Sequence, residues 1–334
     1  MSERVAISAA SAPAERAALP WRSLLGAAAI LGLAVLPLLL VSGYQLFQIT
    51  LALIYAIAIL GVNIVTGYNG QISLGHGAFY AVGAYVTAIL MGDLEWSYWP
   101  TLPIAAVVCG LLGYGIGFPA LRLGGLYLAL TTFSLAVAVP QLLKYKAIED
   151  WTGGVQGLLI SKPEPPEWLG LSADEFLYVI VALATIVIFL LARNLVQSRI
   201  GRALRAIRDQ PTAAEAMGMD LAQLKTRAFA VSAMVTGIAG SLSAIAIEFV
   251  APDSFSLTLS VTLFVGMVVG GVASIIGPLF GGLFVVFVPN FAESVSKAAP
   301  GVIYGIILIA ILFVMPSGVA GLLRRAGSLL ARRD

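Results

Sequence analysis

The sequence is poor in charged residues. Only 11% of its 334 residues are Asp, Glu, Lys or Arg, whereas 60% are hydrophobic. A soluble domain carries about 25% charged residues, so this chain has too little charge to cover a water-facing surface of its size. Apolar runs of about 18 residues or more recur along it, and each is long enough to cross roughly 30 Å of hydrocarbon. The sequence therefore predicts an all-α, polytopic membrane protein.

Cysteine and histidine are even scarcer. Cys109 is the one cysteine and His76 is the one histidine. A single cysteine excludes an internal disulfide and a cysteine metal cluster, and a single histidine excludes a His pair for zinc. No Gly-Lys-Ser or Gly-Lys-Thr phosphate loop and no Gly-x-Ser-x-Gly elbow occurs in the sequence. We therefore expect no enzyme activity, no metal site and no cofactor. The net charge of +2 is too small to indicate a nucleic-acid partner.

The apolar runs predict about ten transmembrane helices in a membrane domain of residues 23–322. The first run is longer than the apolar core of a signal peptide, about 7–15 residues, which favours a retained span. Eight or nine spans with a re-entrant piece at 67–77 or 277–291 are the alternative. Residues 1–22 are expected to form a disordered tail, and residues 323–334 a basic tail. The ten runs lie near residues 23–41, 44–66, 73–91, 100–121, 126–143, 175–192, 228–249, 257–274, 277–291 and 302–319.

The distribution of charge predicts the orientation in the membrane. Fourteen of the nineteen Lys and Arg residues fall in residues 1–22, 193–227 and 323–334, whereas the long loop 144–175 is acidic and rich in proline. Cytoplasmic segments near span ends carry an excess of Lys and Arg. With ten spans, all three basic segments lie on one side. We therefore expect both termini and residues 193–227 in the cytoplasm, and residues 144–175 on the periplasmic side.

The stretch Gly67–Phe79 has glycines and uncharged polar side chains where the neighbouring runs are apolar. Backbone at membrane depth leaves a regular helix only where protein or water satisfies its polar groups. We therefore predict a non-helical joint that serves as gate and hinge of a transport pathway. The second run is about 33 Å long at 1.5 Å per residue, which places the joint near the cytoplasmic boundary. The candidate pathway residues are Asn63, Asn69, Gln71, Ser73 and His76, and the candidate hinge glycines are Gly67, Gly70, Gly75 and Gly77.

Several of these residues have two open interpretations. His76 either lines the pathway or is satisfied by neighbouring carbonyl groups, and Asn63 and Gln71 either line the pathway or bond between helices. Ser73 is expected to cap the third helix, leaving its positive end facing the joint. The glycines are explained most simply by close helix approach or by positive φ angles. A second glycine-rich turn, 270–278, joins two spans in a corresponding position, as in transporters built from repeats.

The basic segment 193–227 contains helix signals. Asp209 or Gln210 is expected near the start of a short helix, Pro211 in its first turn and Gly218 at its end. Asp220 is then expected to cap a second short helix over residues 221–227. The segment is either a solvated loop whose arginines only fix the orientation or a docking element that presents small and apolar side chains to a cytoplasmic partner. The candidate docking residues are Arg205, Asp209, Ala214, Glu215, Met217, Gly218, Met219 and Asp220.

These motifs resemble those of a known family. Residues 61–79, continuing through Gly83-Ala84-Tyr85, resemble the signature of LivM-type permeases of branched-chain amino acid ABC importers. Other stretches that resemble the same family are residues 152–158, residues 199–209 and, towards the C-terminus, residues 304–305, residues 315–318 and Gly321. Glu215-Ala216-x-Gly218 is similar to the coupling-loop motif that engages the ATPase subunit. The resemblance covers about residues 44 to 322.

The resemblance implies a type II-like permease domain in the bacterial inner membrane, in contact with membrane lipid. It also implies a LivH-like second permease subunit, two cytoplasmic ATPase subunits that use the ATP, and a periplasmic substrate-binding protein. Two departures bear on the substrate: Gln156 stands where the family more often has Asn or Asp, and the fifth run lacks an acidic residue near its middle. Branched-chain amino acids are the expected substrate, with urea, short amides, or aromatic or dicarboxylic acids as alternatives.

Two other classes of function are weaker explanations. A self-sufficient secondary transporter predicts a membrane-buried carboxylate or arginine for ion coupling, and the centres of the apolar runs contain none. A purely structural scaffold explains neither the joint nor the docking element.

Overall fold

The structure, a computed structural model, describes residues 36–41, 43–120, 126–297 and 299–330. The chain divides into two units, Met1–Ser42 and Gly43–Asp334. Of the first unit, residues 36–40 are helical. The tail predicted over residues 1–22 and most of the first apolar run lie outside the described residues. Everything below concerns the second unit.

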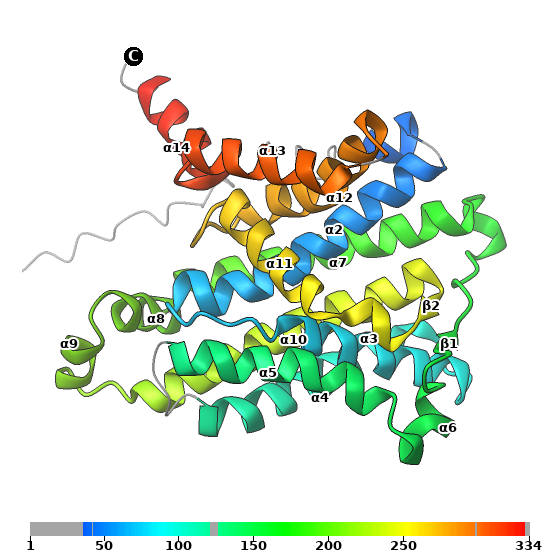
Figure 1. Cartoon of the computed structure of the whole chain (residues 1–334), viewed down its shortest axis with the longest axis horizontal. Helices are drawn as coiled ribbons and strands as arrows, with labels where there is room; N and C mark the ends of the chain where they lie inside the picture. Colours follow the sequence, from blue (N-terminus) through cyan, green and yellow to red (C-terminus); the bar gives the residue numbers. More distant parts are fainter. Residues whose placement is uncertain (1–35, 42, 121–125, 298, 331–334) are drawn as a thin grey trace, which may run out of the picture. The chain divides into compact units, whose positions relative to one another are not determined.

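The second unit is almost entirely helical, as predicted (Figure 1). Its only strands among the described residues are two short ones, which pair with each other. Its α-helices are α2 (Tyr44–Val62), α3 (His76–Gly92), α4 (Tyr98–Ala120), α5 (Leu126–Leu143), α6 (Glu149–Thr152), α7 (Ala173–Gln197), α8 (Arg199–Asp209), α9 (Pro211–Ala216), α10 (Leu221–Ile247), α11 (Leu257–Gly270), α12 (Gly277–Val295), α13 (Pro300–Val314) and α14 (Gly318–Leu330). A π-helix (Asn63–Tyr68), three 3₁₀ helices (Lys146–Ile148, Glu167–Leu169 and Pro252–Phe255) and strands β1 (Leu158–Leu159) and β2 (Phe249–Val250) complete it.

The described residues contain six helices that are long and apolar enough to cross a membrane, or seven if the bent pair 127–143 and 146–152 is one span. The polytopic class is therefore confirmed, whereas the predicted number of ten is not. Helices α3 and α11 are apolar but shorter, with 17 and 14 residues. Both are short because a non-helical segment takes up residues that the apolar pattern assigns to the span. Before α3 that segment is the joint, and after α11 it is the second glycine-rich turn.

Helix α10 is the central helix of this unit and packs against α2, α3 and α4. Small residues let the backbones approach closely. A Cβ added at Gly83 of α3 would overlap the backbone of Gly237, and one added at Gly240 would overlap the backbone of Tyr80. Cys109 of α4 is buried beside Gly237 and has a free thiol. Glycine-mediated contacts of this kind are common between membrane helices, where dispersion and close packing replace the hydrophobic effect.

The segment predicted as a cytoplasmic loop, residues 193–227, is mostly helical. Helix α7 runs on to Gln197, and α10 begins at Leu221 and continues without a break through the predicted next span. The expected second short helix over residues 221–227 is therefore wrong as a separate element: it is the first two turns of a helix of 27 residues. Good helix formers continue through this stretch, so nothing in the backbone ends the helix at the membrane boundary.

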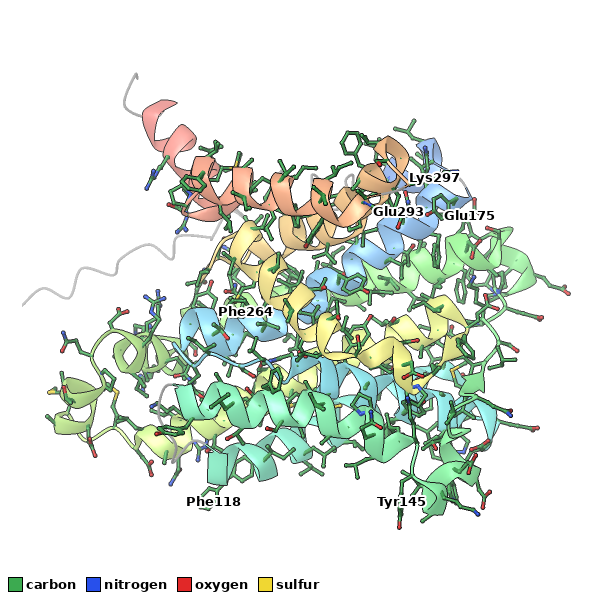
Figure 2. All side chains as sticks on the ribbon, viewed as in Figure 1. Phe118, Tyr145, Glu175, Phe264, Glu293 and Lys297 are labelled. Carbon is green, nitrogen blue, oxygen red and sulfur yellow. The ribbon has the colours of Figure 1, made fainter. Side chains whose placement is uncertain are left out.

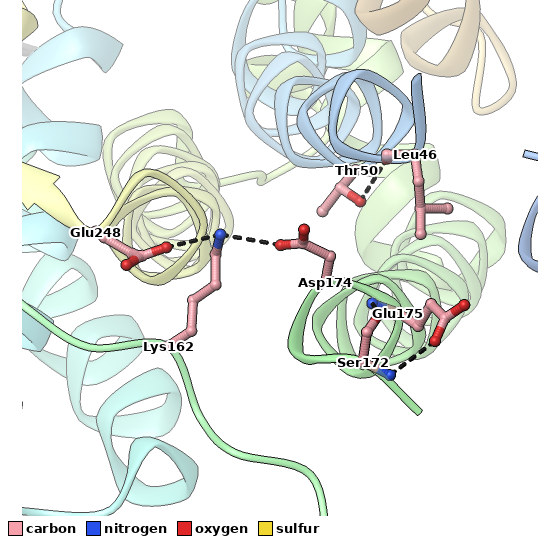
Figure 3. A network of polar contacts seen from close by, with 7 residues as sticks. All are labelled: Leu46, Thr50, Lys162, Ser172, Asp174, Glu175 and Glu248. Carbon is pink, nitrogen blue, oxygen red and sulfur yellow. Dashed lines mark hydrogen bonds and ion pairs between the residues drawn. The ribbon is translucent and has the colours of Figure 1, made fainter. Parts of the chain in front are cut away.

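Opposite α8 and α9, at the other end of the helices, an ion network ties the loop before α7 to the helices around it (Figures 1 and 3). Lys162 Nζ lies 2.7 Å from Glu248 Oε1 at the end of α10 and 3.0 Å from Asp174 Oδ1 at the start of α7. Burial by itself lowers the pKa of Lys162, but its hydrogen bonds to Glu248 and Asp174 and their negative charges raise the pKa above its ordinary value of 10.5. Strands β1 and β2 pair alongside, Leu158 opposite Val250. The long loop is therefore anchored to the ends of two spans.

Much of the outer surface is apolar. Helix α13 has no buried residue, and Phe118 on α4 and Tyr145 after α5 point away from the neighbouring helices (Figure 2). Exposed apolar surface of this extent marks contact with a membrane or with another subunit.

Candidate functional site

The predicted joint is present but shorter than Gly67–Phe79: Gly67 and Tyr68 belong to the π-helix, and residues 76–79 belong to α3. Helix α2 passes directly into Asn63–Tyr68, and the chain is then non-helical from Asn69 until α3 begins at His76. Within it the backbone folds back on the π-helix, because Gln71 N–H donates to Val65 O at 3.1 Å and Thr66 Oγ1 donates to Gln71 O at 2.9 Å. π-helical turns occur frequently at functional sites. The joint is therefore a defined turn rather than an open loop.

Asn63 holds the joint against the second glycine-rich turn. Its Nδ2 donates to Ser274 O at 2.7 Å, and its Oδ1 accepts from Ala273 N–H at 2.9 Å. Ala273 has a φ of +56°, which is costly for a residue with a Cβ. The side chain of Asn63 is completely buried, at 0% exposed. In this conformation Asn63 hydrogen-bonds the π-helix to the second glycine-rich turn. This agrees with the second of the two interpretations of Asn63, a bond between helices.

Two hinge glycines are required by their surroundings. A Cβ at Gly67 would overlap Asn63 Oδ1 and come within 2.7 Å of Ala273 N. Gly70 has a φ of +73°, and its added Cβ would lie 2.7 Å from Arg208 Cγ. Gly75 and Gly77 lie against Thr132 and Ser260, respectively. Close approach and positive φ therefore account for these glycines, as expected, and their role as a hinge stays a prediction.

His76 is buried in a hydrogen-bonded chain that crosses to α10. Its Nε2 lies 2.6 Å from Ser232 Oγ, and its Nδ1 lies 3.1 Å from Ser73 Oγ. Ser232 Oγ donates to Gly61 O at 2.6 Å, so the lone pairs of Ser232 Oγ are free to accept a hydrogen bond from His76 Nε2–H. A neutral imidazole with its proton on Nε2 and an accepting Nδ1 satisfies every member. The partners of His76 are serine hydroxyls, and not the carbonyl groups of the turn that the sequence suggested.

Ser73 does not cap α3. The residue before the helix is Gly75, no side chain caps it, and His76 is the first helical residue rather than one turn into the helix. Hydroxyl groups from two other helices satisfy the backbone instead. Thr132 Oγ1 on α5 accepts from Leu74 N–H at 3.0 Å, and Ser260 Oγ on α11 accepts from Gly77 N–H at 2.9 Å. These acceptors leave the first turn of α3 less available to a carboxylate than expected.

Asn69 and Gln71 differ from the other candidates because their side chains have no partner. They are 2% and 5% exposed, and both amide atoms of each side chain lack a hydrogen bond in this structure. An unsatisfied buried polar group costs about 1–3 kcal/mol, so such groups call for an explanation, and a role in function is one. This pair is therefore the strongest candidate for groups that engage another molecule in a second conformation.

The predicted docking element consists of α8 and α9. Ser198 Oγ caps α8 by accepting from Ile200 N–H and Gly201 N–H. Helix α9 begins at Pro211 after Gln210, as expected, and Gly218 follows it with a φ of +81°. Asp220 caps α10 by accepting from Gln223 N–H at 2.9 Å. In Figure 1, α9 lies at the far end of the helices from β1 and β2.

The candidate docking residues differ in how far they are exposed. Met217 is 80% exposed, and Glu215, Gly218 and Asp220 are exposed too. Ala214, in contrast, is buried against its own chain, so the expectation that its side chain faces a partner is wrong for this structure. Met219 is half-buried. Arg205 donates to Gly201 O and Val196 O, so it holds the corner between α7 and α8.

Arg208 links the docking element to the joint. Its Nη1 donates to Gly67 O at 2.9 Å, and its Nε lies 2.9 Å from Asp209 Oδ1. The sequence marks Arg208 only as one arginine of a basic segment, and no local pattern connects it with Gly67, which is 141 residues away. For the same reason, the sequence did not predict that Thr132, Ser232 and Ser260 contact the joint and the start of α3. Among the described residues, no group of three His, Cys, Asp or Glu side chains is placed to hold a metal ion.

A family model described as the permease component of the branched-chain amino acid transport system matches residues 44–314. The chain belongs to this family. The match includes the joint, the docking element and nearly all of the described helices. The resemblance drawn from the motifs is therefore confirmed.

Individual relatives agree with this assignment. The chain is 34% identical over 234 residues to the high-affinity branched-chain amino acid transport system permease protein LivM of Escherichia coli, covering 63% of this chain and 55% of the relative. It is 33% identical over 236 residues to the protein of the same name from Salmonella typhimurium, with the same coverage. A probable branched-chain amino acid transport permease protein LivM of Methanocaldococcus jannaschii is 24% identical over 164 residues, covering 46% of this chain and 45% of the relative.

The chain spans about half the length of the curated relatives it matches. No solved structure matches it. The family is one of transport permeases and not of enzymes. Together with the apolar helices, it assigns the chain to the multi-pass proteins of the bacterial inner membrane.

Proposed function

We propose that this chain is a translocation subunit of an ATP-binding cassette importer. It forms half of the pathway for branched-chain amino acids or related small polar or carboxylate solutes. It pairs with a LivH-like second permease, binds two cytoplasmic ATPase subunits and receives its solute from a periplasmic binding protein. It holds no cofactor of its own, and the ATP is used by the partner subunits. The family and the names of the relatives support branched-chain amino acids as the substrate.

One observation carries the proposal. The docking element connects two long helices, α7 and α10, and also touches the joint through Arg208. A partner that binds Met217 and Glu215 and moves α9 therefore acts on both helices and on the joint together. A small helix with an exposed apolar anchor suits insertion into a groove on another protein.

Helix α5 supports the proposal that one chain forms only half of a pathway. Tyr127, Ser134 and Gln141 lie seven residues apart on one face of α5, and all three are exposed in this chain. Serine and glutamine side chains on membrane helices often hydrogen-bond across helix interfaces. A second permease subunit packed against this face would enclose them.

Orientation follows from the basic docking element. Arginines cluster on α8 and carboxylates on the opposite end, so the positive-inside rule favours a cytoplasmic docking element, and we propose that both termini lie on that side too. Ion-coupled transport is the less favoured mechanism because the middle turns of the described spans carry no Asp, Glu, Lys or Arg. Energy from ATP in partner subunits removes the need for such a group.

The docking assignment is tested with variants of α9 in the complex reconstituted in proteoliposomes. Glu215→Arg reverses an exposed charge, and Gly218→Pro cannot adopt the φ of +81° found there. Both are expected to lower ATPase binding, solute-stimulated ATP hydrolysis and uptake, with unchanged membrane insertion.

Matched controls exist at the opposite end of the molecule. Gly170 also has a positive φ, +59°, and open space around it, and Glu167 is an exposed carboxylate in the same loop. Gly170→Pro and Glu167→Arg are expected to retain the ATPase subunits. Normal uptake by the α9 variants would refute the docking assignment, and uptake by the chain without any ATPase would refute the importer.

The substrate is tested separately, by competition. Uptake of labelled leucine by the complete importer is expected to be inhibited by valine and isoleucine, and not by urea, short amides or dicarboxylic acids. Inhibition by one of these other solutes instead would assign the chain to that substrate class.

A further inference from the structure

Arg208 of α8 donates a long-range hydrogen bond to the joint. In a continued helix, Gly67 O would accept from the backbone four or five residues further on. Here Gly70 N–H donates to Thr66 O and Gln71 N–H donates to Val65 O. The Arg208 guanidinium supplies the donor to Gly67 O, at 2.9 Å. A hydrogen bond from a charged donor is shorter and stronger than one between neutral groups.

The side chain of Arg208 also shapes the joint sterically. Gly70 lies so close to the Arg208 methylene groups that its added Cβ would be 2.7 Å from Cγ. The guanidinium and the aliphatic stem of one side chain therefore hold two positions of the joint, three residues apart. Helix α8 is itself held on the protein by Leu204 and Ile207, which are buried.

The same side chain also pairs with the last residue of α8, close to the start of α9. Arg208 Nε pairs with Asp209, whose side chain is 61% exposed and which directly precedes Gln210, the residue before α9. A partner that binds α9 lies next to this ion pair. Displacement of α9, or a new partner for Asp209, therefore changes the ion pairing and the position of the guanidinium that holds Gly67.

Asn69 and Gln71, the two residues next to Gly70, are the buried amides without partners. They lie on the part of the joint that Arg208 covers. The conformation that buries them is therefore opposed by their unsatisfied polar atoms and held by the contacts of Arg208.

We propose that Arg208 is the positioning residue that keeps the joint closed over Asn69 and Gln71. Movement of α9 then releases the joint from Arg208. Release lets the joint turn about its glycines and exposes both amides to the pathway, where they hydrogen-bond a polar solute or water. The inference rests on the proposed function for the identity of the docking partner, whereas the link between Arg208 and the joint belongs to this chain alone.

The test reports on the joint directly. Gln71→Cys is introduced with Cys109→Ala, which removes the one native cysteine, and a water-soluble maleimide measures how fast position 71 reacts in the full complex without ATP. Arg208→Gln is expected to raise this rate at least about tenfold, the change expected when a hydrogen bond to a charged group is lost. Arg208→Lys keeps a positive charge but lacks the planar guanidinium donors, so its labelling rate is expected to lie between those of the parent and Arg208→Gln.

The matched control is Arg202→Gln. Arg202 is an exposed arginine on the same helix and donates to Gln197 O within its own corner. It is expected to leave the labelling rate unchanged. With position 71 native, Arg208→Gln is also expected to hydrolyse ATP while importing at least about tenfold less leucine per ATP, whereas a merely structural loss would lower both activities together.

The outcomes separate this inference from the proposed function. Labelling of Arg208→Gln and Arg208→Lys at the parental rate would overturn the inference, even in a working importer. A parental complex that neither binds an ATPase nor imports solute would overturn the proposed function, while faster labelling in the Arg208 variants would still support the link to the joint.

Discussion

Asn63→Ala is expected to destabilise the protein by removing the contact between the joint and the second glycine-rich turn. The substitution deletes two hydrogen bonds and leaves Ala273 N–H and Ser274 O without their side-chain partner. Hydrogen bonds between membrane helices are worth on average about 0.6 kcal/mol, and leaving a buried partner unsatisfied costs about 1–3 kcal/mol. Both backbone groups are only partly buried, so we expect a total loss of about 1–3 kcal/mol.

Asn63→Asp is the sharper variant. It keeps the size of the side chain and the acceptor for Ala273 N–H, but it loses the donor to Ser274 O and puts a carboxylate in a completely buried position. Burying an unpaired charge costs far more than losing a neutral hydrogen bond. Asn63→Asp is therefore expected to destabilise more than Asn63→Ala, although it is the closer match in shape.

The assay is thermal unfolding of the purified protein in detergent, with uptake measured in parallel. Asn290→Ala is the control, because Asn290 Nδ2 donates only to Val286 O, one turn back in its own helix. Its loss is expected to stay near about 0.6 kcal/mol. A double-mutant cycle of Asn63→Ala with Gly67→Ala adds a second check, since the methyl group at position 67 would overlap Asn63 Oδ1.

Removal of Asn63 relieves part of that overlap, so the two costs should not add, with a coupling of at least about 0.5 kcal/mol. Strict additivity, or an Asn63→Ala protein as stable as the parent, would refute the view that Asn63 holds the two turns together. Ala273→Gly is expected to be neutral or stabilising in the parent, because glycine adopts a φ of +56° without strain.

Three further predictions concern other contacts. Ser232→Ala removes the partner of His76 Nε2 and the donor to Gly61 O, so it is expected to lower stability by about 1–3 kcal/mol. The control is Ser294→Ala, because Ser294 is exposed and bonded within its own helix. An equal loss of stability in both variants would contradict this prediction. Gly83→Ala is expected to lower the melting temperature, because overlap of its methyl group with Gly237 costs about 1–3 kcal/mol of stability. Gly115→Ala meets open space and should be neutral or stabilise the protein by up to about 1 kcal/mol. Lys162→Met should lower stability below pH 10.5, because the pKa of Lys162 is raised in the folded protein and its contribution is lost only as pH rises through that higher pKa. The difference in melting temperature between the parent and Lys162→Met should therefore shrink as pH rises above 10.5. A difference that stays constant with pH would contradict the assigned role.

Several features of the fold could be read from local patterns. Low charge and long apolar runs predict a helical membrane protein, and Pro211 and Gly218 bracket a short helix because one has a fixed φ and the other adopts a positive φ. The joint was predictable because glycines and amides interrupt an apolar run. The start of α3 was not, because Ser73 looks like a cap by sequence, yet hydroxyl groups of α5 and α11 satisfy the backbone there.

By itself, the sequence determined the class of protein, its family, and the places of the joint and of the docking element, because these depend on composition and on motifs within a few residues. The tertiary structure alone decided which groups meet at the joint. His76 and Ser232 are 156 residues apart, Asn63 and Ala273 are 210 apart, and Arg208 and Gly67 are 141 apart. Such pairs form because packing of α10, α11 and α12 against α2 brings distant turns to one level of the bundle. That packing depends on the fit of whole helix faces, which no local pattern records.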